Sequence, residues 1–174
     1  MTPPPAQLSV MAVDAFACVK VAGRATMACG VDFAAVLTEL SRTGFTRIVF
    51  DLSECTHMDS TFLGLLAGFG LKLSQAGSRL AELLNPNERV TELLESLGVL
   101  NLFSTSSGAI PLPEGVEASS HAPLHPSRQE VTRTCLQAHQ NLMKINPDNV
   151  PRFRDVADFL ARDLKKLEEG PVHP

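Results

Sequence analysis

The feature that most constrains the fold of this chain is an apolar run that leads into a polar junction and then into a second apolar run. The first run is RIVFDL at residues 47–52, the junction is HMDST at 57–61, and the second run is LGLLAGFGLKL at 63–73. Charged residues flank the first run, which is typical of a central strand covered by helices. Apolar residues recur at helical spacing through the second run, which therefore predicts a buried helix. The polar junction should lie between a strand and a helix.

Three glycines, Gly64, Gly68 and Gly70, lie in the second run. Glycine lowers the intrinsic stability of a helix by up to ~1 kcal/mol relative to alanine, so tertiary packing must sustain this helix. Gly64 and Gly68 have the Gly-x-x-x-Gly spacing of some membrane helix pairs, but the run is shorter than the ~20 residues that span a bilayer. We expect dense packing inside an α/β domain instead.

The rest of the first hundred residues alternates between strand and helix patterns. In chain order we predict a strand hairpin at 8–13 and 16–21, a helix that ends at Gly44, the strand at 47–52, the helix after the junction, a strand at 77–84 and a helix that ends at Gly98. This order predicts an α/β fold in which a mixed sheet of about four strands packs with helices.

The composition changes after residue 104. Residues 105–126 are rich in Ser, Gly and Pro and predict a linker between an α/β domain at 1–104 and an extension at 127–174. Ser127 and Glu130 have the spacing of a helix capping box.

Two amphipathic helices follow the capping box, and Asn149 is a candidate cap for the second one. Two helices alone bury too little apolar surface to be stable. Their apolar faces should therefore dock on the α/β domain, on a second copy of the chain in a homodimer, or on a partner protein, and the sequence leaves these three alternatives open.

Charge and composition exclude some classes of partner. The net charge is −4 and the sequence pI is about 5.7, and no basic patch is evident, so we expect no nucleic acid partner. The N-terminus MTPPPAQLS lacks the basic residues and apolar core of a signal peptide. We therefore expect a cytoplasmic protein without membrane insertion.

Neither a catalytic site nor a metal site is predicted. A nucleophile elbow needs Gly-x-Ser-x-Gly, which MDSTF lacks, and the nearness of His57 to Ser60 in sequence does not pair them in space. His121 and His125 are expected to be solvated residues of the linker, since no third ligand lies near them. We expect no cofactor, no metal and no enzyme activity, and four reduced, structural cysteines.

The polar junction has two interpretations. Asp59 or Ser60 can cap the helix that begins near Thr61 by accepting hydrogen bonds from its first free amides. Alternatively, a hydroxyl in the first helical turn can carry a phosphate, which the helix dipole and free amides would favour. A phosphate there would leave the fold largely intact and repel a partner that packs over the helix start.

Several motifs together resemble the STAS domain (sulfate transporter and anti-sigma factor antagonist). The family pattern is a strand, Asp-Leu-Ser, and then Met-Asp-Ser-Ser-Gly-Leu-Gly-Leu-Leu at a helix start; here Asp-Leu-Ser stands at 51–53 and Met-Asp-Ser-Thr at 58–61. The segment NPNERVTELLESLGVLNLF at 85–103 is similar to the last helix of the family. The resemblance covers about residues 7–104 and is most specific over 51–66.

The resemblance implies a regulatory switch. In the antagonist branch of the family, the hydroxyl two positions after the motif Asp accepts phosphate from a kinase that is also an anti-sigma factor. Carried over to this chain, Asp59 is the motif Asp, Thr61 is the first candidate acceptor and Ser60 the second. The implied partner is an anti-sigma factor with serine kinase character, or another regulatory protein, which the unmodified form binds and the modified form releases.

The implied partner surface comprises Met58, Asp59, Ser60, Thr61 and Phe62. The chain departs from the family at Phe62, because the family commonly has glycine there. The alternative function is a constitutive STAS scaffold or complex subunit that is not phosphorylated, in which residues 59–61 only cap the helix.

Overall fold

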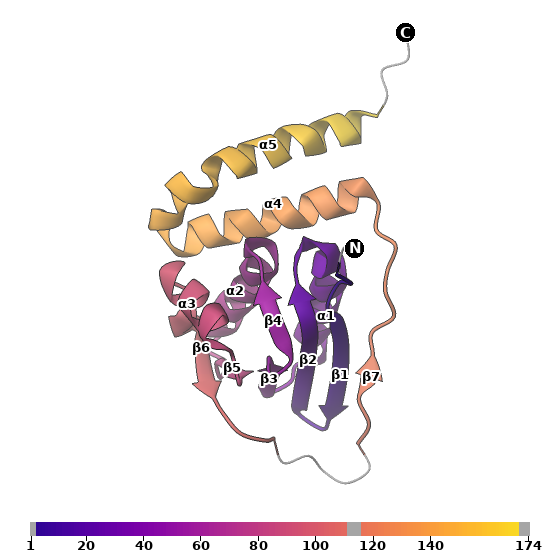
Figure 1. The fold of residues 1–174 in the computed structure, drawn as a ribbon, viewed down its shortest axis with the longest axis vertical. Coiled ribbons are helices and arrows are strands. Elements are labelled where there is room, and N and C mark those ends of the chain that lie inside the picture. Colours follow the sequence, from indigo (N-terminus) through magenta and orange to yellow (C-terminus); the bar gives the residue numbers. More distant parts are fainter. Residues whose placement is uncertain (1–2, 111–115, 171–174) are drawn as a thin grey trace.

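A computed structural model describes residues 3–110 and 116–170 (Figure 1). Its strands are β1 (Gln7–Val13), β2 (Phe16–Ala25), β3 (Arg47–Asp51), β4 (Cys55–Met58), β5 (Ala81–Leu84), β6 (Phe103–Ser106) and β7 (Ser119–Ser120). Its helices are α1 (Gly30–Thr43), α2 (Ser60–Gln75), α3 (Glu88–Ser96), α4 (Arg128–Ile145) and α5 (Val150–Glu169).

The described strands form one mixed sheet in the order β6-β5-β3-β2-β1-β7, and β4 also pairs with β2. β1 and β7 are antiparallel to their neighbours, whereas β2, β3, β4, β5 and β6 pair in parallel. The predicted α/β class and mixed sheet are confirmed. The sheet has seven strands in place of about four, because β4, β6 and β7 are short and partly polar and lack an apolar period.

The apolar run at 47–52 is explained by burial on both faces of the sheet. Ile48 and Phe50 join the large core between the sheet and helices α1 and α2. Val49 points to the other face, where it packs with Cys18 and Leu84. An alternating polar pattern is absent from β3 because neither of its faces is open to water.

Several predicted helix ends are confirmed. Gly44 and Gly98 both adopt left-handed backbone conformations, with φ of 73° and 69°, directly after helical segments. The side chain of Ser127 accepts a hydrogen bond from the amide of Glu130, and the Glu130 carboxylate accepts one from the amide of Ser127. Asn149 stands at the N-cap position of α5, as predicted, but its side chain makes no capping hydrogen bond, because its amide donates to the carbonyls of Leu97 and Leu142.

Part of the predicted linker is attached to the α/β domain. β7 pairs with β1 at the sheet edge. The Nε2 atom of His121 lies 3.0 Å from the Oδ1 atom of Asp32, and the amide of Leu124 donates to the same oxygen at 2.8 Å. The expectation that His121 is a solvated loop residue is therefore wrong, because the buried carboxylate of Asp32 binds residues 121–124 at the start of α1. His125 is exposed.

The two C-terminal helices form an antiparallel pair, called here the α4–α5 hairpin. In Figure 1, α4 lies between α5 and the α/β domain. Ala138 and Leu142 of α4 are fully buried and belong to the main core. Of the three alternatives left open by the sequence, the hairpin docks on its own α/β domain.

Two properties of the described residues concern membranes and metals. None of the helices in 3–110 and 116–170 is both long enough and apolar enough to cross a membrane. Within the same residues, no group of three or more His, Cys, Asp or Glu side chains is arranged to hold a metal ion.

Candidate functional site at the start of α2

Asp59 holds the start of α2 in place through both of its carboxylate oxygens. Oδ1 accepts a hydrogen bond from the amide of Phe62 at 2.9 Å, which is the helix cap predicted from the sequence. Oδ2 accepts a bond from the amide of Met27 at 2.8 Å. The amide of Asp59 itself donates to the carbonyl of Ala25 at the end of β2. One residue therefore caps α2 and ties it to the segment that precedes α1.

Ser60 is half-buried and contacts a histidine of α4. Its Oγ atom lies 3.0 Å from Nε2 of His139, and Nδ1 of His139 lies 2.7 Å from the carbonyl oxygen of Cys135. A carbonyl only accepts hydrogen bonds, so Nδ1 carries a proton; in the neutral ring Nε2 is then an acceptor. The Ser60 hydroxyl donates to it. Among the described residues, no hydrogen bond joins the side chains of His57 and Ser60.

Thr61 is buried, with 4% of its surface exposed, beneath α4. Its neighbour there is the thiol of Cys135. Burial raises the pKa of the Cys135 thiol, and a hydrogen bond from Thr61 partly opposes that shift. Thr61, the first candidate acceptor, is therefore out of reach of another protein while α4 is docked.

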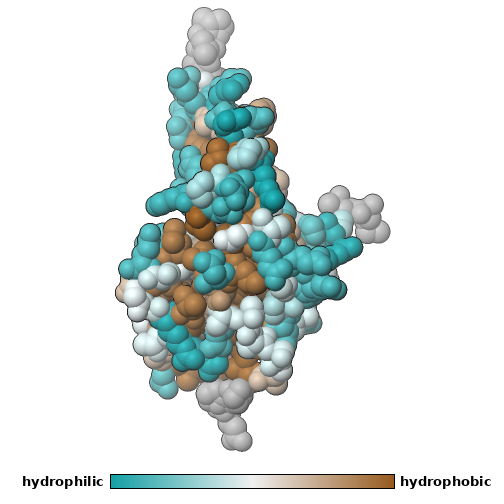
Figure 2. All heavy atoms as spheres, turned by 90° about the vertical axis from the view of Figure 1, so that its left-hand side faces the viewer, coloured by the Kyte–Doolittle hydropathy of each residue, from teal (hydrophilic) through white to brown (hydrophobic). Residues whose placement is uncertain are grey.

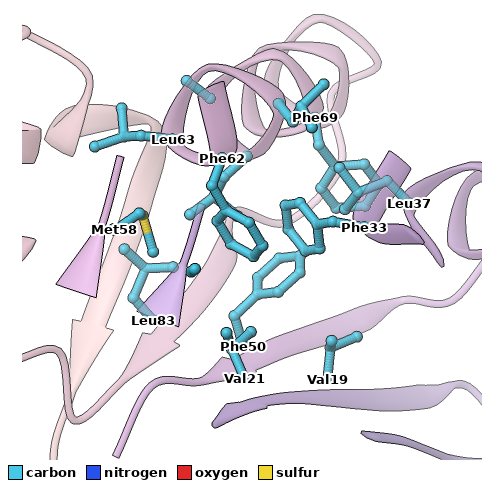
Figure 3. Close-up of a cluster of buried hydrophobic side chains, with 14 of the residues drawn as sticks. Val19, Val21, Phe33, Leu37, Phe50, Met58, Phe62, Leu63, Phe69 and Leu83 are labelled. Carbon is cyan, nitrogen blue, oxygen red and sulfur yellow. The ribbon is translucent and has the colours of Figure 1, made fainter. Parts of the chain in front are cut away.

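Phe62 and Met58 point into the core of the α/β domain. Phe62 is fully buried and stacks on Phe33 of α1, with ring centroids 3.9 Å apart and planes at 15° (Figure 3). Phe33 also meets Phe50 of β3 edge-on, at 6.0 Å. Met58 is 3% exposed. The aromatic side chain that stands where the STAS family commonly has glycine therefore fills the core in this structure.

α4 reaches the α2 start because two glycines remove side chains between the helices. A Cβ atom on Gly64 would overlap the backbone carbonyl of Ala138, and one on Gly68 would overlap the side chain of Asn141. The side-chain amide of Asn141 donates to the carbonyl of Gly64 at 3.1 Å. The dense packing predicted for this glycine pair is present, but it is made with the extension and not within the α/β domain. Gly70 does face that domain, against Phe103.

The candidate site therefore comprises the predicted residues Asp59, Ser60 and Thr61 together with two residues that the sequence did not single out, His139 and Asn141. Met58 and Phe62 lie beneath it. His139 follows Cys135 by four positions and so shares the apolar face of its helix; a polar residue on that face was the available signal. Whether Ser60 or Thr61 accepts phosphate, and whether 58–62 contact a partner, stay predictions.

One solved structure has the same fold as part of this chain, and two further solved structures match it more weakly. The first is a Thermotoga maritima protein, tm1081, assigned as an anti-sigma factor antagonist: the TM-score is 0.51 at 20% identity, over 58% of this chain and 86% of the other. The anti-sigma factor antagonist SpoIIAA matches in its unphosphorylated form (TM-score 0.45, 20% identity, 51% and 81% covered). The Bacillus cell fate determinant SpoIIAA matches in its phosphorylated form (0.48, 19%, 57% and 90%).

A search of curated proteins gave no match. The family model described as "Mlab, STAS domain" matches residues 9–104, which is more than half of the chain and contains every strand from β2 to β5 and the start of α2. The protein belongs to the STAS domain family.

Proposed function

We propose that this protein is a non-enzymatic regulatory protein that resembles the anti-sigma factor antagonists and acts in signalling or transcription regulation by binding another protein. Its partner is an anti-sigma factor with serine kinase character or another regulatory protein. Phosphorylation of Ser60 or Thr61 at the start of α2 switches that binding. The proposal places the protein in the cytoplasm, where such partners act.

One observation carries this proposal: the hydroxyl of Ser60 packs against His139 at a distance of 3.0 Å. That distance is one hydrogen bond and leaves no room for a phosphoryl group between the two atoms. Thr61 is more enclosed than Ser60, with 4% of its surface exposed. A phosphate on either residue would also stand beside the carboxylate of Asp59, where two like charges repel. Modification would therefore change which surface the α2 start can pack against.

The transfer would follow ordinary phosphoryl chemistry. The hydroxyl oxygen of Ser60 or Thr61 forms a bond to the γ-phosphorus of a nucleoside triphosphate held by the kinase. The bond from that phosphorus to the departing nucleoside diphosphate breaks, and the hydroxyl proton passes to a base of the kinase. This chain supplies only the hydroxyl.

A constitutive scaffold is the second candidate, and the burial of Thr61 and Phe62 favours it. In that function Asp59 caps α2, Ser60 and Thr61 hold α4, and no residue of the junction changes state.

A homodimer through the helical extension would be a further kind of assembly. Val156 and Phe159 of α5 are 44% and 67% exposed and would lie at such a contact.

Capture of partners from the native cell distinguishes the switch from the scaffold. We expect baits with Thr61→Glu and Ser60→Glu to lose a regulatory protein that the wild type retains, because a carboxylate in the α2 start repels a surface that packs there. The matched control is Ser74→Glu, which places the same charge on an exposed hydroxyl position in the last turn of α2. The amount of each retained protein is measured by quantitative mass spectrometry. If all four baits hold the same complex, the protein is a scaffold.

A further inference from the structure

The seam between the α4–α5 hairpin and the α/β domain contains buried polar side chains beside apolar ones. Three of the buried polar side chains in the described residues lie along it: Thr61, His139 and Asn149. Inter-domain contacts that open and close are more polar than permanent cores. The seam therefore has the composition of a contact that can separate.

Hydrogen bonds hold the second half of α4 and the turn of the hairpin to the domain. Within α4 these are the contact of His139 with Ser60 and the bond from Asn141 to Gly64. At the turn, the side chains of Asn146 and Asn149 both donate to the carbonyl of Leu97, at 3.3 and 2.9 Å. Leu97 follows α3, and its carbonyl lacks an intrahelical partner of its own.

The buried apolar residues of α4 are Cys135, Ala138 and Leu142, and only leucine among them is large. Ile145 and Phe153 of the hairpin add partly buried apolar surface that packs against the main core. The Oδ1 atom of Asn149 is buried without a hydrogen-bond partner. A buried polar atom without a partner opposes docking, because the atom would be hydrated if the hairpin moved away.

The hairpin also covers the surface that the proposed function assigns to a partner. Thr61 is 4% exposed, and its side chain is hydrogen-bonded to Cys135 of α4. Gly64 and Gly68 form a face of α2 without side chains, on which the backbone of Ala138 and the side chain of Asn141 lie in direct contact. Figure 2 shows the hairpin as the narrower part of the molecule that projects from the broader α/β domain.

We propose that the α4–α5 hairpin is a displaceable intramolecular occupant of this α2 face, and that a partner binds by placing a helix of its own where α4 lies. The inference rests on the proposed function for the location of the partner surface. When the hairpin leaves α2, the α/β domain stays folded. The apparent affinity for the partner is then the intrinsic affinity multiplied by the fraction of molecules in which the hairpin is open.

The test loosens the hairpin without altering the α2 face. His139→Ala combined with Asn141→Ala removes two hydrogen bonds from α4, and Gln140→Ala combined with Lys144→Ala is the matched control at exposed positions of the same helix. The readout in the purified full-length protein is the alkylation rate of each cysteine. Cys135 reports on the seam, whereas Cys18, Cys29 and Cys55 lie within the α/β domain and report on its unfolding.

We expect the loosened variant to alkylate Cys135 about tenfold faster than the wild type and the control, with the other three thiols unchanged, since each lost bond weakens docking modestly. The same bait should retain about tenfold more partner at limiting concentration. An unchanged Cys135 rate, or equal acceleration of all four thiols, would overturn the inference, because the hairpin would then open only with the whole fold.

The two proposals fail in different ways. If the loosened variant exposes Cys135 but binds no more partner, while Thr61→Glu abolishes binding, the switch stands and the hairpin does not compete with the partner. If Thr61→Glu and Ser60→Glu keep every partner, the proposed switch fails whatever the alkylation rates are.

Discussion

Replacement of Phe62 by alanine is expected to lower the free energy of unfolding by about 3–5 kcal/mol, the usual cost of deleting a buried phenyl ring. Phe62 is fully buried and lies in face-to-face contact with Phe33, next to Phe50. In Figure 3 the ring of Phe62 lies beside the rings of Phe33 and Phe50, so its removal would leave a cavity among them. Urea unfolding followed by circular dichroism measures the loss.

Phe159→Ala is the matched control, since this phenyl ring is 67% exposed on α5. Its removal should change the stability by no more than about 0.5 kcal/mol. If Phe62→Ala lowers the free energy of unfolding by less than about 1 kcal/mol, Phe62 is not a core residue, and its proposed place on the partner surface becomes the better explanation.

Gly64→Ala is expected to separate α4 from α2. A methyl group at this position overlaps the carbonyl of Ala138, which is backbone and cannot turn aside, so the whole of α4 must shift. Such overpacking costs about 1–3 kcal/mol. Alanine also stabilises α2 itself by up to ~1 kcal/mol, so the α/β domain should keep its stability. Hydrogen exchange of the peptides from 128–145 should therefore accelerate about tenfold or more, while β2 and β3 stay protected.

Gly68→Ala is the comparison within the same helix. Its methyl group would meet the side chain of Asn141, which can rotate, so exchange in α4 should rise less than for Gly64→Ala. Equal protection of α4 in Gly64→Ala and the wild type would show that the helices are not in direct contact at this point.

The sequence was sufficient to predict elements whose signals are local. Gly44 and Gly98 end helical segments, Asp59 caps α2, and Ser127 begins a capping box, because each motif depends on residues within one turn of helix. The strands β6 and β7 were missed because their polar side chains stand at the sheet edges, where backbone pairing alone defines a strand.

The candidate site could be predicted only in part, since its second half comes from a distant segment. The amphipathic faces of α4 and α5 predicted docking but did not indicate the surface on which they dock. The sequence also could not show whether the side chain of Phe62 points into the core or toward a partner. Residues 61–70 of α2 are all buried, so the spacing of its apolar residues does not distinguish a core face from a partner face. Asn149 resembles a cap in sequence, yet two carbonyls of the fold take up its amide.

The central claim is that the junction is a phosphorylation switch, and the most direct measurement is the modification state of the protein purified from its native cell. Trypsin releases residues 48–72 as one peptide, which contains Ser60 and Thr61 and, as internal controls, Ser53 and Thr56. Fragmentation spectra should place a single phosphate on Ser60 or Thr61 in part of the molecules and none on the controls. The contrary result has two parts: spectra that cover the whole peptide and show no phosphate, and a protein that holds its partner under every growth condition tested. Together they would contradict the switch and support the constitutive scaffold.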